Sequence, residues 1–129
     1  MNIYYGNIDE YQELFSEYTG RGDLKIHCFQ VGGALPVEGA NVVVNKRVGD
    51  DLLKMGEGMT DISGIVEFQN LPCRAIEYSL VPDVVPYAGV FYEITLTHPV
   101  FGIIYDRVAV FDDVTTVYRE FYEPPRSTN

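Results

Sequence analysis

The chain has 129 residues, with 9 lysines and arginines against 19 aspartates and glutamates, and a formal net charge of -10. Hydrophobic residues make up 47% of it, which is enough to bury the core of a single domain. The charge disfavours nucleic acids and anionic membrane surfaces, because both attract proteins through lysine and arginine, and no apolar run approaches the roughly 18 residues of a membrane-spanning helix.

The first twenty residues predict one short amphipathic helix. Asn7 followed by Glu10 has the spacing of a capping box. Apolar side chains then recur at helical intervals as far as Gly20, namely Ile8, Tyr11, Leu14, Phe15 and Tyr18. This apolar stripe either covers the chain's own domain or docks in a partner. No basic residue precedes Arg21, so we expect no classical secretory signal peptide.

From Gly22 onward the sequence predicts β-strands. Valine occurs sixteen times and alanine five times, a bias expected where β-branched side chains stand on a pleated sheet. We expect strands over 24–31, 40–48, 52–59, 65–70, 75–81, 90–98, 106–111 and 114–121. Thr60 to Gly64 predicts a tight turn in which Gly64 adopts a positive φ, and Asp112-Asp113 predicts the last hairpin. Short strands without intervening helices indicate an antiparallel sandwich or barrel.

Alternation along these strands predicts which side chains are buried. The inward rows are Leu24/Ile26/Cys28, Ala40/Val42/Val44, Val66/Phe68, Ile76/Tyr78/Leu80, Tyr92/Ile94/Leu96 and Val108/Val110. Cys28 therefore reads as a small buried hydrophobic residue. A disulfide with Cys73 stays open, because it requires the fold to bring the two Cα atoms within about 7 Å.

Several short motifs occur in a characteristic order. They are Gly22-Asp23-Leu24-Lys25-Ile26, Pro36-Val37-Glu38-Gly39-Ala40-Asn41-Val42, Thr60-Asp61-Ile62-Ser63-Gly64-Ile65-Val66, Asn70-Leu71-Pro72, Tyr92 to Phe101, and Val108-Ala109-Val110-Phe111. Together they resemble the carboxypeptidase-regulatory-like, or transthyretin-like (prealbumin-like), β-sandwich domains of clostridial spore-associated and surface proteins. The resemblance covers about residues 22–121.

This resemblance implies an all-β fold, a seven- to eight-stranded antiparallel Greek-key sandwich, here with the short helix before it. We expect three parts: an N-terminal arm with the helix over 1–21, the sandwich over 22–121, and a C-terminal tail over 122–129. Domains of this type typically serve as spacers, assembly modules or binding platforms.

One branch of the transthyretin-like fold, the 5-hydroxyisourate hydrolases, is enzymatic. His27 aligns with the first-strand histidine of that family, but Ile65 follows Gly64 where the family has an arginine. The His-Val-Pro-Leu motif is absent, and Tyr118-Arg119 continues into Glu120-Phe121 instead of Gly-Ser. We therefore expect no catalytic residue and no enzymatic activity.

Other chemistries have weaker support still. His27 and His98 lack the spacing of metal ligands, and His27 reads as a solvent-facing strand residue. Asp50-Asp51 and Asp112-Asp113 would suit calcium, but acids in solvated turns are the favoured interpretation. An isopeptide crosslink from Lys25 is disfavoured, because its parity points outward. We expect no metal and no cofactor.

The favoured function is a non-enzymatic structural or assembly module, a subunit or spacer of a spore-surface, filamentous, cell-surface or virion structure. Its partner would be a protein, either a second copy, forming a homo-oligomer, or another structural subunit. The candidate interface residues are aromatic: Tyr4, Tyr5, Tyr11, Phe15, Phe121 and Tyr122. The alternative is a carbohydrate- or peptidoglycan-binding module, supported by ten tyrosines and weakened by the lack of tryptophan.

The family points to an exterior or particle-associated location. Residues 1–23 hold five acidic residues and one basic residue, so a partner of their polar side is expected to be basic and its binding to weaken with salt.

Overall fold

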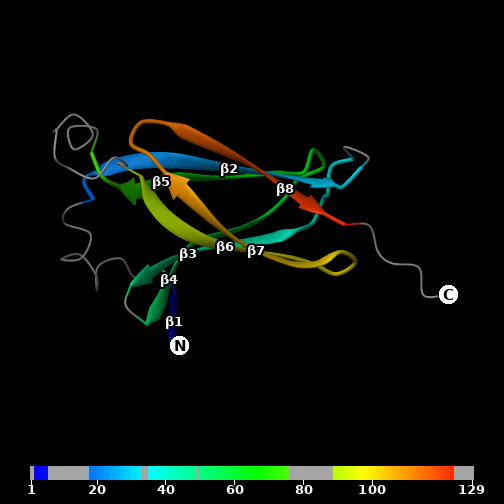
Figure 1. The fold of residues 1–129 in the computed structure, drawn as a ribbon, viewed down its shortest axis with the longest axis horizontal. Helices are drawn as coiled ribbons and strands as arrows, with labels where there is room; N and C mark the ends of the chain where they lie inside the picture. Colours follow the sequence, from blue (N-terminus) through cyan, green and yellow to red (C-terminus); the bar gives the residue numbers. More distant parts are fainter. Residues whose placement is uncertain (1, 6–17, 33–34, 49, 76–88, 124–129) are drawn as a thin grey trace.

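The computed structural model describes residues 2–5, 18–32, 35–48, 50–75 and 89–123, and within them it contains eight strands in two sheets (Figure 1). The strands are β1 (Asn2–Tyr5), β2 (Gly20–Gln30), β3 (Asn41–Val48), β4 (Asp51–Met59), β5 (Ile65–Cys73), β6 (Val90–His98), β7 (Gly102–Val110) and β8 (Thr115–Tyr122). The larger sheet has the order β1-β4-β3-β6-β7, and the smaller one has the order β5-β2-β8. The all-β prediction is confirmed.

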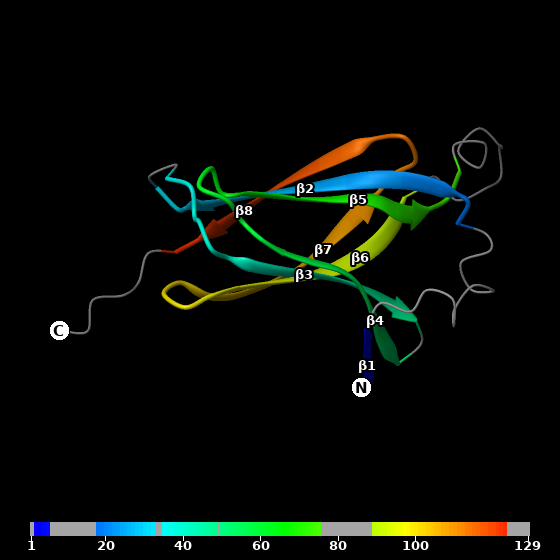
Figure 2. The same cartoon turned by 180° about the vertical axis from the view of Figure 1, so that it is seen from behind.

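Two strand pairs correct the expectation of a wholly antiparallel fold. β8 pairs with β2 in parallel, and β1 pairs in parallel with the start of β4. Asp112-Asp113 is therefore not a hairpin turn, because β7 and β8, which it joins, lie in different sheets (Figures 1 and 2). The parallel partner of β8 is β2, almost the whole chain earlier, so local turn chemistry gave no sign of this pairing.

The N-terminal part differs from its prediction where the structure describes it. Residues 2–5, which we expected in an arm, form the edge strand β1 of the larger sheet. Gly20, expected to end a helix, begins β2 instead. Residues 6–17, which carry most of the predicted helix, lie outside the described residues, as does nearly all of the strand predicted over 75–81.

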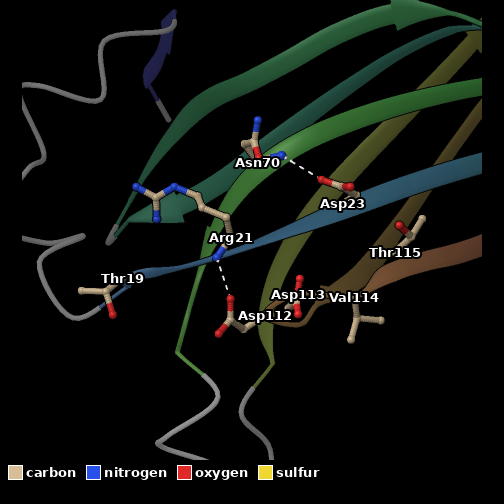
Figure 3. A pocket seen from close by; sticks show the side chains of 8 residues that line it. All are labelled: Thr19, Arg21, Asp23, Asn70, Asp112, Asp113, Val114 and Thr115. Atoms are coloured by element: carbon tan, nitrogen blue, oxygen red, sulfur yellow. Dashed lines mark hydrogen bonds between the residues drawn. The ribbon is translucent and has the colours of Figure 1, made fainter.

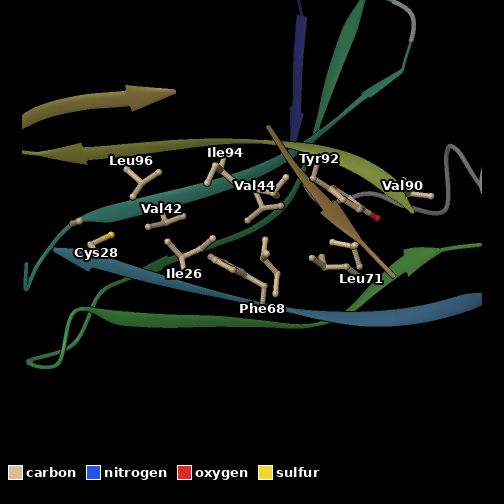
Figure 4. Close-up of a cluster of buried hydrophobic side chains, with 14 of the residues drawn as sticks. Ile26, Cys28, Val42, Val44, Phe68, Leu71, Val90, Tyr92, Ile94 and Leu96 are labelled. Carbon is tan, nitrogen blue, oxygen red and sulfur yellow. The ribbon is translucent and has the colours of Figure 1, made fainter. Parts of the chain in front are cut away.

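The core lies between the two sheets, and the alternating rows build it (Figure 4). Leu24, Ile26 and Cys28 of β2 are fully buried, as the alternation predicted. Figure 4 shows Ile26 and Cys28 on the side of β2 that faces Val42 and Val44 of β3. The rows on β6 and β7 are buried as well, namely Tyr92, Ile94, Leu96, Val108 and Val110. Each large apolar side chain removed from water contributes roughly 1.5–3 kcal/mol, so these rows are the main source of stability.

Two local devices fit the turn predictions. Gly64 has φ 77°, and Asp61 organises its turn by accepting hydrogen bonds at Oδ1 from the backbone N–H groups of Ser63 and Ile65. Thr60 Oγ1 donates to the Val37 carbonyl and accepts from the Ala40 N–H, which ties the strand before this turn to the start of β3. These contacts explain the Thr-Asp-x-x-Gly motif as structural.

Candidate interaction surfaces

Apolar side chains are concentrated at one end of the sandwich, which we call the apolar end. β2 and β8 end there, β5 begins there, and the turns from β4 to β5 and from β6 to β7 lie beside them, on the right in Figure 1. Among the described residues, eleven large hydrophobic side chains are exposed, and seven of them belong to this end: Val31, Leu35, Met59, Ile62, Val100, Ile103 and Phe121. Exposed apolar side chains that gather at one end of a domain are typical of interaction sites.

Phe121 is the predicted interface residue that the structure places here. It is 52% exposed, and its ring stacks on that of Phe29 across the β2–β8 pair, with 5.9 Å between centroids. His27, on the same outer face of the smaller sheet, is half-buried, with its ring 4.0 Å from that of Phe29. The expected solvent-facing histidine is therefore packed beside this aromatic pair, and its Nε2 lies 3.1 Å from the Ser63 carbonyl.

Tyr122 corrects one interface prediction. It is 2% exposed, because alternation along β8 turns it inward while Phe121 turns outward. Its ring packs against those of Phe101 and His98 beneath the apolar end. Its side chain is therefore buried and cannot meet a partner in this fold.

The remaining predicted interface residues are not brought to this end. Tyr4 and Tyr5 lie in β1, whose backbone pairs with Leu53 and Lys54 near the start of β4, away from the apolar end. Tyr11 and Phe15 fall outside the described residues.

His98 has a structural role in the β6–β7 turn. Its Nδ1 accepts hydrogen bonds from the backbone N–H groups of Val100 and Phe101, at 3.1 and 3.4 Å. The proton therefore sits on Nε2, which donates to the Glu38 carbonyl at 3.0 Å. Both ring nitrogens are used within the fold, which leaves neither for a metal.

The acidic turn at the other end of the sandwich lines a shallow pocket of about 610 Å³ (Figure 3). Asp112 Oδ1 accepts from the Arg21 N–H, and Asp23 Oδ1 accepts from the Asn70 N–H, each at 3.0 Å. These carboxylates thus brace backbone groups at the strand ends. Across the described part of the chain, no group of three or more histidine, cysteine or acidic side chains is arranged to hold a metal ion.

A groove of about 590 Å³ lies on the outer face of the larger sheet, and we call it the sheet groove. Asn45, Glu93 and Arg107 stand side by side across β3, β6 and β7, since they are register partners. Arg47 reaches the same place and binds Glu93, with Nη2 and Nε at 3.0 and 3.1 Å from Oε2. Tyr105 lines the groove and is 75% exposed.

Asn45 is the unusual member of the sheet groove. It is 7% exposed, and its Oδ1 has no hydrogen-bond partner among the described residues. Asn45 stands on the outer side of β3, as the alternation predicts, and its register with Glu93 on β6 is unbroken. The β-bulge lies on β4, where Met55 is the extra residue opposite Val44 and Asn45. Parity predicts that Asn45 points outward but not that its neighbours bury it, so the groove was not predictable from the sequence.

A second buried polar group, Glu120, lies inside the sandwich. It is 7% exposed and is paired in register with Cys28 on β2. Burial, and then a hydrogen bond and the charge of Asp106, raise its pKa to about 8. Glu120 alternates in step with Tyr118 and Tyr122, which also point inward, and this spacing could have predicted that its side chain is buried.

No known family model and no curated protein matches this sequence. Solved structures do match its fold. The Bacillus anthracis TIE protein aligns with TM-score 0.56 and 18% identity, and the shaft pilin SpaA of Lactobacillus rhamnosus GG, solved as a D295N mutant, with 0.57 and 10%. The 5-hydroxyisourate hydrolase of Klebsiella pneumoniae aligns with 0.52 and 16%.

The chain has a transthyretin-like β-sandwich fold. The alignments cover 81–82% of this chain in all three cases, but they cover 17% of the TIE protein, 51% of the pilin and 92% of the hydrolase. At such identities the likeness shows the fold alone, and the fold hosts both structural proteins and enzymes. The described residues include no helix of the length and apolarity that crossing a membrane requires.

Proposed function

We propose that this sandwich is a non-enzymatic structural module that associates, through its apolar end, with copies of itself or with another structural subunit. The carrying observation is the convergence of seven exposed large hydrophobic side chains on one end of a chain that is otherwise strongly acidic. A net charge of -10 keeps the chains apart at long range, so contact would depend on this apolar surface.

The structural neighbours support a role outside the cell or in a particle. One is described as a shaft pilin, and the alignment with it spans 51% of that protein, so one sandwich of this kind corresponds to part of a larger subunit. We infer by analogy a place in a surface filament, spore coat or virion. The aromatic residues Tyr4, Tyr5, Tyr11 and Phe15 are proposed to add contacts to a partner.

The hydrolase neighbour does not change this proposal. Its chemistry requires a group of side chains of which this sequence offers His27 alone, and Ile65 takes the place of the arginine. His27 itself lies against Phe29 and the Ser63 carbonyl.

The test compares association of the native chain with that of variants at the apolar end. Ile62→Asp and Val100→Asp place charge at two exposed positions, 76% and 61% accessible, and should leave folding intact. Light scattering and electron microscopy over a concentration series should show assemblies of the native chain and a shift to monomers in both variants.

Val114→Asp is the matched control, because Val114 is an exposed valine outside the apolar end. It should assemble like the native chain. A native chain that stays monomeric at every concentration contradicts self-association. The remaining form of the proposal, binding of another structural subunit through the apolar end, then requires that Ile62→Asp weakens binding of that subunit.

A further inference from the structure

We propose that the sheet groove binds a single carboxylate-bearing sugar unit, such as a terminal uronic acid of a glycan. This proposal goes beyond the assembly function and uses a different surface, on the larger sheet and away from the apolar end. Four features carry it: an unpartnered buried amide, a fixed ion pair, an exposed aromatic ring, and an arginine, Arg107, that makes no ion pair among the described residues.

The floor of the groove requires a hydrogen-bond donor. Asn45 Oδ1 is buried without a partner among the described residues, and a buried unsatisfied acceptor typically costs about 1–3 kcal/mol. Such a group is explained when a ligand supplies the missing donor. A sugar hydroxyl or an acetamido N–H satisfies it, whereas an apolar ligand does not.

The side of the groove matches neighbouring hydroxyl groups. Arg47 and Glu93 are joined by two contacts of 3.0 and 3.1 Å to Oε2, so their orientation is set before a ligand arrives. The pair presents guanidinium N–H donors beside carboxylate lone pairs. Because each hydroxyl both donates and accepts, two adjacent hydroxyls of one sugar ring can bond to Arg47 and Glu93 together.

Tyr105 offers a platform beside these polar groups. It is a register partner of Thr95 on the outer face, and it is 75% exposed. The flat apolar face of such a ring suits the C–H face of a sugar, and its hydroxyl remains free to bond with solvent or ligand. A groove of about 590 Å³ is within the usual size for a small ligand.

Charge selects an acidic sugar over a neutral one. The Arg107 guanidinium sits 4.4 Å from the centroid of the Phe91 ring, and this contact holds it while leaving its N–H edge open to a carboxylate. Arg47 is paired with Glu93, whereas Arg107 makes no ion pair among the described residues, so Arg107 is the cation that a ligand's carboxylate would meet. The net charge of -10 opposes long polyanions, so a single acidic unit fits better than an acidic polymer.

The experiment uses two ligands that differ only in the group of interest, methyl β-glucuronide and methyl β-glucoside. Both are titrated into the full chain and followed by ¹H–¹⁵N NMR. The glucuronide should shift the amide signals of Asn45, Glu93 and Arg107 with millimolar affinity, and the glucoside should bind several-fold more weakly.

Arg107→Met should weaken glucuronide binding about tenfold, because it removes a charged hydrogen bond to the carboxylate. Tyr105→Ala should weaken binding of both sugars, because it removes the ring on which the C–H face of the sugar would lie. Lys25→Met is the matched control, because it removes an exposed cation from the outer face of the other sheet. It should bind like the native chain, and the spectra of all variants report whether they are folded.

Three results overturn the proposal: equal binding of the two sugars, no shift in the groove, or a preference for an acidic peptide such as tetraglutamate over the glucuronide. None of them bears on the apolar end, so this proposal and the assembly function can fail separately.

Discussion

Glu120 on β8 and Asp106 on β7 interact across the seam where the edges of the two sheets meet, and this interaction adds to burial in raising the pKa of Glu120. Glu120 is buried, whereas Asp106, which shares its side of the larger sheet with Ile94 and Val44, is exposed on the edge strand β7. Ionisation of Glu120 buries a charge and sets it against the Asp106 carboxylate, so we expect the seam to weaken when Glu120 loses its proton.

Stability should fall as pH rises through this titration. The folded pKa of about 8 lies above the ordinary value of 4.5, so Glu120 favours the folded state fully only below about pH 4.5, and the penalty is complete above about 8. We expect Glu120→Gln to be more stable than the native chain at pH 9, by on the order of a few kcal/mol. Urea unfolding at pH 4 and pH 9 measures this, and parallel pH profiles of the two proteins would refute it.

Tyr92→Phe should destabilise the chain by about 1–3 kcal/mol, because it leaves a buried carbonyl unpaired. The buried hydroxyl of Tyr92, on β6, donates to the Pro72 carbonyl on β5 and so joins the two sheets through the core. Thermal and urea denaturation give the difference. Tyr105→Phe, at an exposed position, should change stability by less than about 0.5 kcal/mol, and equal effects of the two variants would contradict the role of the hydrogen bond.

Gly64→Ala should cost much more than Gly39→Ala. Both glycines have positive φ, 77° and 82°, so each alanine pays a backbone strain of about 1–2 kcal/mol. At Gly64 a Cβ would also lie 2.5 Å from the Cys28 carbonyl oxygen, whereas at Gly39 it meets no atom within 4 Å. The clash should add about 1–3 kcal/mol in equilibrium unfolding. Similar losses at both positions would show that the close approach is unimportant.

Both cysteines should be free and unreactive in the native chain. Cys28 and Cys73 are buried and unbonded, and burial raises their pKa values to about 12 and about 11, with Glu120 and Asp112 adding smaller contributions. A thiol reagent should label neither at neutral pH and both after denaturation, because the thiolate is the reactive form. An intact mass 2 Da below that of the reduced chain would reveal a disulfide and contradict the structure.

The inward rows were predictable from the sequence because side chains alternate along a strand with a period of two. The burial of Leu24, Ile26 and Cys28 could therefore be predicted without knowing which strands lie beside theirs. The pairing of the strands was harder to predict, since no local sequence pattern indicates that β8 lies beside β2 and not beside β7. The outward direction of Asn45 follows from the same period, but its burial does not, because burial depends on neighbours contributed by β6 and β7. Phe121 is exposed, as predicted. The prediction that Tyr122 is exposed was wrong, because neighbouring side chains on a strand point to opposite faces and Tyr122 points inward.

The parallel pairing of β8 with β2 also affects how the chain reaches its native state. Asp23 pairs with Thr115 and Gln30 with Tyr122, so the central strand of the smaller sheet gains its second neighbour only when the C-terminal residues are in place. Contacts between such distant parts of a chain are slow to form. During synthesis, one edge of β2 would stay unpaired and open to other strands until β8 leaves the ribosome.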